Sequence, residues 1–353
     1  MAMRARAEFP DRRPTIRHVA ARAGVSVGTV SNVLNGDTPV SDARRTAVLD
    51  AIAALGFQPN SVAQSLRRRH SRVVGLMATG AASAYFAALL ESFEDIAARQ
   101  GYEVMQVLSR GDPELETRRV GALLARQVDG LIMVPTQTPE RSFDLIAAAG
   151  VPAVMIDRAY PDPRFDYVTM DNDAAMRAAV AALAAEGHRR LLYVVRWPGL
   201  VTTRARIAAF HDAAALRGLG AGMLARDPAD DAFAAQLACL LQGPERPDAI
   251  IASNSDLALP MLAALQALGV GVGRDIGVLV FDEPIWAGVM TPPLAVVRHP
   301  VAAIARSAWE ILIDRMEHGG DERRRIVHAA EIVMRGSARR RRSDTGGEAK
   351  TAT

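Results

Sequence analysis

Residues 15–35 read TIRHVAARAGVSVGTVSNVLN, and this stretch decides how the first part of the chain folds. Its apolar residues recur at helical spacing as far as Ala23, and Gly24 follows where a left-handed residue would end a helix. Ser26 is then a typical N-cap of a second helix, in which Val30 continues the apolar stripe. Two helices joined by so short a turn predict a helix-turn-helix unit, although periodicity alone also fits another kind of helical hairpin.

A third helix is predicted between the N-cap Ser41 and the stop Gly56, and it completes a three-helix core. The exposed positions of the second helix carry no charge, only hydroxyls, amides and a valine. Hydroxyls bond phosphates, Asn32 can read a base edge, and Val27 can contact a thymine methyl. The second helix therefore suits the major groove of DNA.

The formal net charge of +3 is unevenly distributed along the 353 residues. Residues 1–72 carry 12 Arg and 5 acidic residues, whereas residues 73–334 carry 24 Arg and 32 acidic residues. Residues 335–353 add 6 basic and 2 acidic residues. A basic head on an acidic body favours a polyanion-binding module joined to a body that binds something else.

The chain length predicts two or three folded domains, and the single Cys239, in an apolar helix, is expected to be a core thiol. The N-terminus has no apolar signal region, so we expect a cytoplasmic protein. The uncharged run at 73–90 has small and polar residues in its middle, which favours a strand and helix opening over a membrane span.

From residue 72 onward, short β-branched runs alternate with Ala-rich helical patterns. Strands are predicted at 73–77, 103–108, 130–134, 153–156, 190–195, 248–252 and 276–281, with helices at 84–100, 114–126, 140–149, 172–186, 202–217, 229–241, 255–268 and 301–318. This alternation predicts parallel sheets covered by helices, and the number of units favours two α/β lobes with a cleft. Ligands bind such folds at the carboxyl ends of strands.

Motifs of catalysis and metal binding are missing from the sequence. The Gly-rich pieces GLGAG (218–222) and GVGVG (269–273) lack the spacing of a dinucleotide fingerprint and are predicted to be helix caps and turns. No Walker A, CxxC, HExxH or GxSxG motif occurs, and the seven His residues are scattered. We therefore expect no cofactor, no metal and no enzymatic activity.

The stretch from Thr15 to Leu76 closely resembles, without a gap, the N-terminal module of the LacI/GalR family of bacterial transcriptional regulators. The resemblance implies that Val27, Gly28 and Asn32 select the operator, while Thr15, Ser26, Thr29, Ser31 and Asn35 hold phosphates. The sequence departs from the family at His18, where an acidic residue is usual. Gly28 also supplies no side chain at a reading position.

Residues 59–69, PNSVAQSLRRR, are too short for a stable free helix. By themselves these residues are more typical of a linker with a solvated Arg run. The resemblance implies instead a hinge helix that forms when two subunits meet over DNA, with Leu66 wedged into the minor groove.

The body resembles the family's effector-binding core, which is similar to periplasmic sugar-binding proteins. The implied domains are a helix-turn-helix head at 13–58, a hinge at 59–71, a core at 72–336 and a basic tail at 337–353. Within the core, lobe 1 is expected at about 72–170 and 295–325, and lobe 2 at about 171–294 and 326–336. The chain would thus cross between the lobes near Asp171, Leu294 and residue 325.

The resemblance also implies a set of effector-binding residues at the ends of strands and the starts of helices. They are Tyr85, Phe86, Asp157, Arg158, Thr202, Arg206, Asn254 and Asp282. Carboxylates, an arginine and an amide suit a polyhydroxylated ligand, because each hydroxyl both donates and accepts. Alternatively, charged cleft residues such as Arg206 and Asp282 pair with each other.

Two departures from the family pattern affect the expected ligand site. Ser255 stands where an Asp is usual, and the segment leading to Arg206 is one residue short. The family's aromatic wall, expected near 223–233, has no clear counterpart, since Phe233 also fits a core position. The ligand class remains open between a sugar, a sugar acid and a nucleobase.

The sequence thus predicts a homodimeric, sequence-specific regulator, and we expect it to be a repressor. Its affinity for double-stranded operator DNA would be controlled by a small-molecule effector. A tetramer is left open, as are inducer or corepressor action and the operator sequence. One alternative is a cytoplasmic ligand-binding protein without specific DNA binding. A further alternative is an α/β enzyme acting on sugars or nucleosides.

Overall fold

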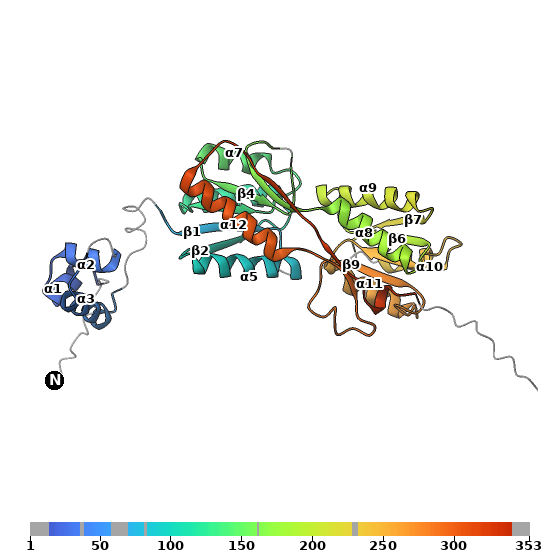
Figure 1. Ribbon diagram of the computed structural model, residues 1–353, viewed down its shortest axis with the longest axis horizontal. Helices are drawn as coiled ribbons and strands as arrows, with labels where there is room; N and C mark the ends of the chain where they lie inside the picture. The colour runs from blue at the N-terminus through green and yellow to red at the C-terminus, as the bar shows by residue number, and fades with distance from the viewer. Residues whose placement is uncertain are drawn as a thin grey trace, which may run out of the picture. The chain divides into compact units, whose positions relative to one another are not determined.

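The computed structural model describes residues 14–35, 39–57, 70–80, 83–160, 162–227 and 232–340. The chain divides into two compact units, Met1–Ser71 and Arg72–Thr353, each with its own core (Figure 1). The expected hinge residues at 59–69, with Leu66, and the tail residues at 341–353 lie outside the described residues.

The first unit is a three-helix domain formed by α1 (Ile16–Ala23), α2 (Val27–Asn35) and α3 (Asp42–Leu55). Gly24 and Gly56 end α1 and α3 in the left-handed conformation, as predicted from the sequence. Between α1 and α2, the Ser26 hydroxyl accepts a hydrogen bond from the Thr29 N–H at 3.0 Å. The fully buried core residues are Val19, Ala20, Val30, Val48 and Ala51.

The first lobe of the second unit is a parallel six-stranded sheet in the order β11-β5-β4-β3-β1-β2. Its strands are β1 (Val73–Ala78), β2 (Glu103–Leu108), β3 (Gly130–Met133), β4 (Ala153–Ile156), β5 (Asp166–Met170) and β11 (Arg325–His328). Its helices are α5 (Ala84–Arg99), α6 (Pro113–Ala125), α7 (Glu140–Ala149) and α12 (Val301–His318). Because α5 and α12 share one apolar cluster with the sheet and α7 joins another, both faces of the sheet are covered.

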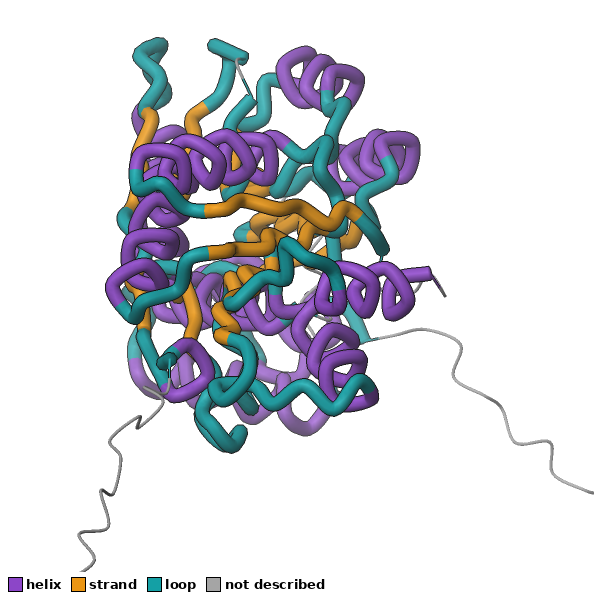
Figure 2. Tube along the Cα trace, turned by 90° about the vertical axis from the view of Figure 1, so that its right-hand side faces the viewer, coloured by secondary structure: helices purple, strands orange, loops and turns teal. Residues whose placement is uncertain are grey.

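The second lobe is a six-stranded sheet with the corresponding strand order, β12-β10-β9-β8-β6-β7. In Figure 2 the strands lie between layers of helices. Its strands are β6 (Arg190–Val195), β7 (Gly220–Ala225), β8 (Ala249–Ala252), β9 (Gly277–Phe281), β10 (Ala295–Arg298) and β12 (Glu331–Val333). Its helices are α8 (Asn172–Ala185), α9 (Val201–Leu216), α10 (Ala232–Gln242), α11 (Ser255–Ala267) and the short η1 (Gly336–Ala338). Only β12, among these strands, runs antiparallel to its neighbour.

The chain crosses between the lobes at places that differ partly from the sequence prediction. The first crossing follows β5 near Asp171, as expected. The return near Leu294 was predicted too early, because β10 still pairs with β9 and the chain leaves the second lobe only at His299. The third crossing was also placed too early, since β11 pairs with β5 as far as His328.

Other differences concern positions whose environment the local pattern does not reveal. β5, β7, β10, β11 and β12 were not predicted, and the last three residues of the predicted turn GLGAG (218–222) begin strand β7 (Gly220–Ala225). Cys239 is exposed, so the prediction of a core thiol is wrong. Helix α10 buries Phe233, Leu237 and Leu241, four residues apart, and Cys239 falls on the opposite face.

Candidate functional site

The helix-turn-helix presents the predicted DNA-contacting residues at the surface of the first unit. Thr15, Ser26, Val27 and Gly28 are exposed, whereas Thr29, Ser31 and Asn32 are half-buried. Val27, at the start of α2, is exposed to 42% despite being apolar, which suits a contact with a thymine methyl. The side chain of Asn35 lies outside the described part of the structure.

His18 takes the role that an acidic residue would have at the start of α1. The backbone N–H of Thr15 donates to the ring Nδ1 of His18 at 3.2 Å and thereby closes a capping box. This contact places an imidazole, not a carboxylate, at the N-terminus of α1.

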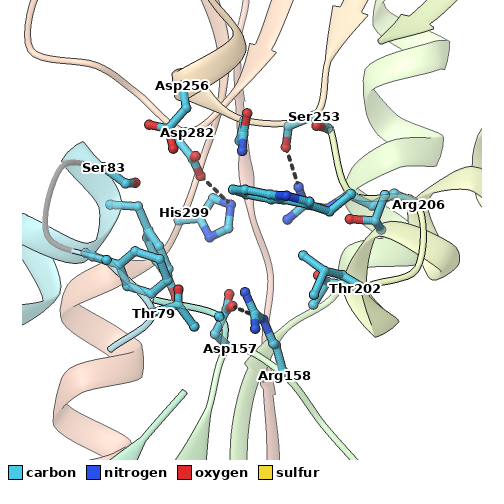
Figure 3. A pocket seen from close by; sticks show the side chains of 18 of the residues that line it. Thr79, Ser83, Asp157, Arg158, Thr202, Arg206, Ser253, Asp256, Asp282 and His299 are labelled. Carbon is cyan, nitrogen blue, oxygen red and sulfur yellow. Dashed lines mark hydrogen bonds and ion pairs between the residues drawn. The ribbon is translucent and has the colours of Figure 1, made fainter. Parts of the chain in front are cut away.

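A cavity of about 290 Å³ lies between the lobes of the second unit (Figure 3). Residues of both lobes line it, and in Figure 3 Ser253 and Asp282 lie across an open space from Asp157 and Arg158. The eight residues predicted to bind the effector all line this cavity: Tyr85, Phe86, Asp157, Arg158, Thr202, Arg206, Asn254 and Asp282.

Two aspartates occupy equivalent positions in the two lobes. Asp157 follows β4 with φ of 65°, and Asp282 follows β9 with φ of 69°, in the left-handed region that non-glycine residues rarely adopt. Each backbone N–H bonds to the neighbouring strand at 3.1 Å, Asp157 to Val168 and Asp282 to Val297. Strained conformations of this kind cluster at functional sites, and here they bring both carboxylates to the cavity.

Asp282 is held by neighbours on two sides. Its Oδ1 lies 3.0 Å from Nε2 of His299, and its Oδ2 accepts from the Ser255 N–H at 3.2 Å. Burial by itself would raise the pKa of Asp282, but His299, Arg206 and the Ser255 N–H outweigh burial and lower it. Asp282 is therefore a carboxylate anchored in the ionised form.

Arg206 is buried in the wall of the second lobe. Its Nε donates to Asn172 Oδ1 at 2.6 Å, its Nη1 donates to the Ser253 carbonyl at 2.9 Å, and its guanidinium lies 4.0 Å from the centre of the Phe281 ring. Within the described residues, no ion pair joins Arg206 to Asp282, so the alternative pairing predicted from the sequence is not found. The contacts with Asn172, Ser253 and Phe281 hold the guanidinium in the wall of the cavity.

On the side of the first lobe, Tyr85 and Phe86 provide aromatic surface. Their ring centroids are 5.0 Å apart, and the Tyr85 ring lies 4.5 Å from that of His299. The Tyr85 hydroxyl is buried without a hydrogen-bond partner among the described residues. Burial first, and then the nearby Asp157 and Asp282, raise the pKa of Tyr85 well above its usual value, so it remains a neutral donor.

Arg158 and Asn254 contribute both to the fold and to the cavity. Arg158 Nη1 donates to the Pro135 carbonyl at 2.8 Å, and its Nε lies 3.6 Å from Asp157. Asn254 caps α11 by accepting from the Leu257 N–H at 3.2 Å.

Several cavity residues were not predicted from the sequence. They are Thr79, Gly80, Ser83, Arg110, Gly111, Gln137, Trp197, Leu200, Thr203, Ser253, Asp256 and His299. His299 could have been found only by recognising β10, which it follows. Phe233, by contrast, is a buried core residue and lies outside this cavity.

The described residues contain no group of three or more His, Cys, Asp or Glu side chains arranged to hold a metal ion. None of their helices combines the length and apolarity needed to cross a membrane.

Two family models match the chain in the regions just described. Residues 15–60 match the model "Bacterial regulatory proteins, lacI family", and residues 180–338 match "Periplasmic binding protein-like domain". This chain joins a lacI-family helix-turn-helix domain to a periplasmic-binding-protein-like core. That combination is the architecture of a DNA-binding transcriptional regulator.

Relatives of the same architecture cover nearly the whole chain. The transcriptional repressor PurR of Aliivibrio fischeri (strain MJ11) is 28% identical over 329 residues, spanning 92% of this chain and 98% of that protein. The ribose operon repressor of Escherichia coli (strain K12) is also 28% identical, over 92% of this chain and 99% of that protein. The regulator KdgR of Bacillus subtilis (strain 168) is 27% identical, over 92% and 97%. These relatives are transcriptional regulators, not enzymes.

Solved structures share the fold of this chain. The lac repressor dimer bound to operator and the anti-inducer ONPF has a TM-score of 0.81 at 24% identity, covering 93% of this chain and all of that one. The complex of the regulator CelR with cellobiose has a TM-score of 0.67 at 28% identity, covering 92% and 100%.

Proposed function

We propose that this chain is a homodimeric repressor whose affinity for operator DNA is controlled by a small polyhydroxylated molecule or nucleobase bound between the core lobes. The observation that carries the proposal is the convergence of Tyr85, Phe86, Asp157, Arg158, Thr202, Arg206, Asn254 and Asp282 on one cavity. These residues come from both lobes, so a ligand that contacts them favours one angle between the lobes over others.

The proposed domains assign one task to each part of the chain. Residues 13–58 read the operator, residues 59–71 form the hinge with Leu66 as its wedge, and residues 72–336 bind the effector and the second subunit. A change in the angle between the lobes alters the separation of the two hinges and hence the affinity for DNA. Because binding is linked, the operator must change effector affinity by the same factor.

The relatives support this reading of the cavity. One is named a ribose operon repressor, and one solved regulator is described as a complex with cellobiose. Anchored carboxylates and an arginine in the cavity suit hydroxyl-bearing ligands of this kind.

Operator binding tests the DNA half of the proposal. Purified full-length protein is titrated against duplexes carrying the inverted repeats beside its own gene, with fluorescence anisotropy at several salt concentrations. We expect binding to at least one repeat to survive a salt concentration that abolishes binding to a scrambled duplex. Equal binding to both duplexes would contradict the proposal and favour a ligand-binding protein without operator specificity.

Ligand binding tests the other half. A thermal-shift screen of sugars, sugar acids and purines identifies compounds that raise the unfolding midpoint, because they bind only the native state. Each such compound is then added to the operator complex and recovered by mass spectrometry. We expect a changed operator affinity and an unaltered compound, whereas a turnover product would indicate an enzyme.

A further inference from the structure

Trp197 lies in the loop between β6 and α9 and lines the cavity between the lobes. This large apolar side chain is 41% exposed, whereas Trp309 in the first lobe is exposed to only 1%. A tryptophan that packed the core would be buried, because burial of its large surface stabilises the fold. Trp197 is therefore placed for a contact that the chain itself does not provide.

Its neighbour Arg196 holds the indole in place. The Arg196 guanidinium lies 4.4 Å from the centre of the Trp197 ring, and its Nε lies 3.0 Å from Asp227 Oδ2. The guanidinium covers one face of the ring, and Pro198 restricts the backbone of Trp197, which precedes it. A cavity ligand therefore meets the other face or the edge of an indole that is already oriented.

The loop that carries Trp197 also approaches the opposite lobe. A Cβ on Gly199 would lie 3.6 Å from the side-chain amide of Gln137, which follows β3 in the first lobe and also lines the cavity. On that same lobe, Tyr85 and Phe86 form the aromatic surface of the cavity. A flat ligand in the cavity is thus offered aromatic side chains from both lobes.

The charged side chains around the cavity largely offset one another. Its lining includes three arginines, Arg110, Arg158 and Arg206, three aspartates, Asp157, Asp256 and Asp282, and His299. Asp157 lies 3.6 Å from Arg158, and Asp282 lies 3.0 Å from His299. A ligand with a net charge would disturb this balance, whereas hydroxyls can bond to both signs.

From these observations we propose that Trp197 is the aromatic platform of the effector site, and that the effector is an uncharged, hydroxyl-bearing ring with one apolar face, as in a cyclic neutral sugar. The inference rests on the proposed function and deepens it. Trp197 supplies from the β6–α9 loop the aromatic wall that the sequence did not reveal near 223–233.

Calorimetric titration of the full-length protein tests the proposal. The probes are neutral aldopentoses and aldohexoses, the corresponding aldonic acids, and hypoxanthine and guanine. We expect binding only by neutral cyclic sugars. Trp197→Ala should lower the affinity for the sugar about tenfold, because one aromatic contact and its buried area are lost. Trp197→Phe should stay within about threefold of wild type, and Arg196→Met should fall between the two, since it frees the ring without removing it.

Tryptophan emission supplies a second measurement. Sugar binding should change the emission of the wild type and of Trp286→Phe, and this change should disappear in Trp197→Phe. The ligand-free unfolding midpoint should remain unchanged in the Trp197 variants, because the side chain is exposed.

The possible failures are distinguishable. Equal sugar affinity of wild type and Trp197→Ala would remove the platform while leaving the proposed function intact. Binding by aldonic acids or purines alone would overturn the uncharged sugar. Binding by none of the probes would overturn the effector site, and the platform with it.

Discussion

Arg206 shows how one side chain can serve both the fold and the ligand. Its N–H groups bond to Asn172 on α8 and to the Ser253 carbonyl after β8, and its guanidinium stacks on Phe281 at the end of β9. These contacts come from three elements of one lobe. They restrict the guanidinium to the orientation in which it lines the cavity.

Replacing Arg206 with Lys should separate these roles. An ammonium cannot bond to Asn172 and Ser253 together or stack flat on Phe281, so we expect effector affinity to fall at least tenfold. The free energy of unfolding should fall by about 1–3 kcal/mol, because two buried acceptors lose their donor. Calorimetry and urea unfolding measure the two effects. Arg204→Lys, on the exposed side of the same helix, is the control and should change neither.

Glu283 determines part of the response to acid. The Nε of Arg298 and the Nη2 of Arg335 donate to its carboxylate and, with Arg298 dominant, lower its pKa. Because the folded pKa is depressed, the stabilisation is present above the unfolded pKa of about 4.3 and is lost as pH falls through the folded pKa.

Glu283→Gln should therefore make the free energy of unfolding depend less steeply on pH in the acid range. We expect a loss of about 1 kcal/mol at pH 7, modest because Arg298 is 40% exposed, and a smaller further loss on acidification than in wild type. Urea unfolding between pH 3 and pH 7 measures both. If the free energy of unfolding of the variant falls with acid as steeply as in wild type, other carboxylates control this pH dependence.

At the scale of elements, the two lobes repeat one sheet order, and equivalent strands β4 and β9 present equivalent aspartates. The loop after β3 is secured by a buried carboxylate from α6. Glu116 accepts the Thr136 N–H at 2.6 Å and a hydrogen bond from the Ser142 hydroxyl of α7. Burial raises the pKa of Glu116, which Ser142 and Thr136 partly offset. The same loop carries Pro135, whose carbonyl holds Arg158.

Glu116→Ala should loosen this loop and weaken the site at a distance. We expect the free energy of unfolding to fall by about 1–3 kcal/mol, because a buried N–H and hydroxyl lose their acceptor, and effector affinity to fall severalfold. Glu116→Gln should lose less, since its amide oxygen can still accept from Thr136. Glu114→Ala, which removes an exposed ion pair with Arg141, should be nearly neutral in urea unfolding. A loss equal to that of Glu116→Ala would contradict the role of burial.

At the scale of the whole molecule, the second lobe exposes large apolar side chains that no described element covers. Leu259 on α11 is 59% exposed, and Ile285 and Val289, in the segment after β9, are 96% and 82% exposed. Exposed apolar residues in adjacent elements are typical of subunit interfaces.

We therefore expect Ile285→Asp combined with Val289→Asp to convert the dimer into a monomer in light scattering. Operator affinity should fall, because two half-sites are no longer bound as a unit. Leu216→Asp, at an 80% exposed position at the end of α9, is the matched control and should remain dimeric. A dimeric double variant would place the interface elsewhere.

Leu66 lies outside the described residues, and its proposed place in a hinge helix is what the family resemblance implies. Leu66→Ala should lower specific operator affinity about tenfold or more, because the apolar wedge that unstacks the central base step is lost. Effector binding, measured by calorimetry, should stay near wild type. Unchanged operator affinity would contradict the proposed wedge role of Leu66.

The sequence by itself determined the helix-turn-helix and the α/β alternation, whereas the eight predicted effector residues came from the family resemblance. In the first two the signal is local: caps at Ser26 and Gly56, and a helical period of 3.6. Edge strand β7 escaped prediction because most of its side chains are exposed, so no apolar run marks it.

Only the tertiary structure decided which distant residues meet in the cavity. His299 joins Asp282 because β10 pairs with β9, and Trp197 lines the site because its loop lies beside the first lobe at Gln137. No periodic or capping pattern in the sequence marks His299 or Trp197, because strand pairing and lobe packing bring their neighbours to them. The fold of each element follows from short-range chemistry, but the composition of the site depends on contacts between segments far apart in the chain.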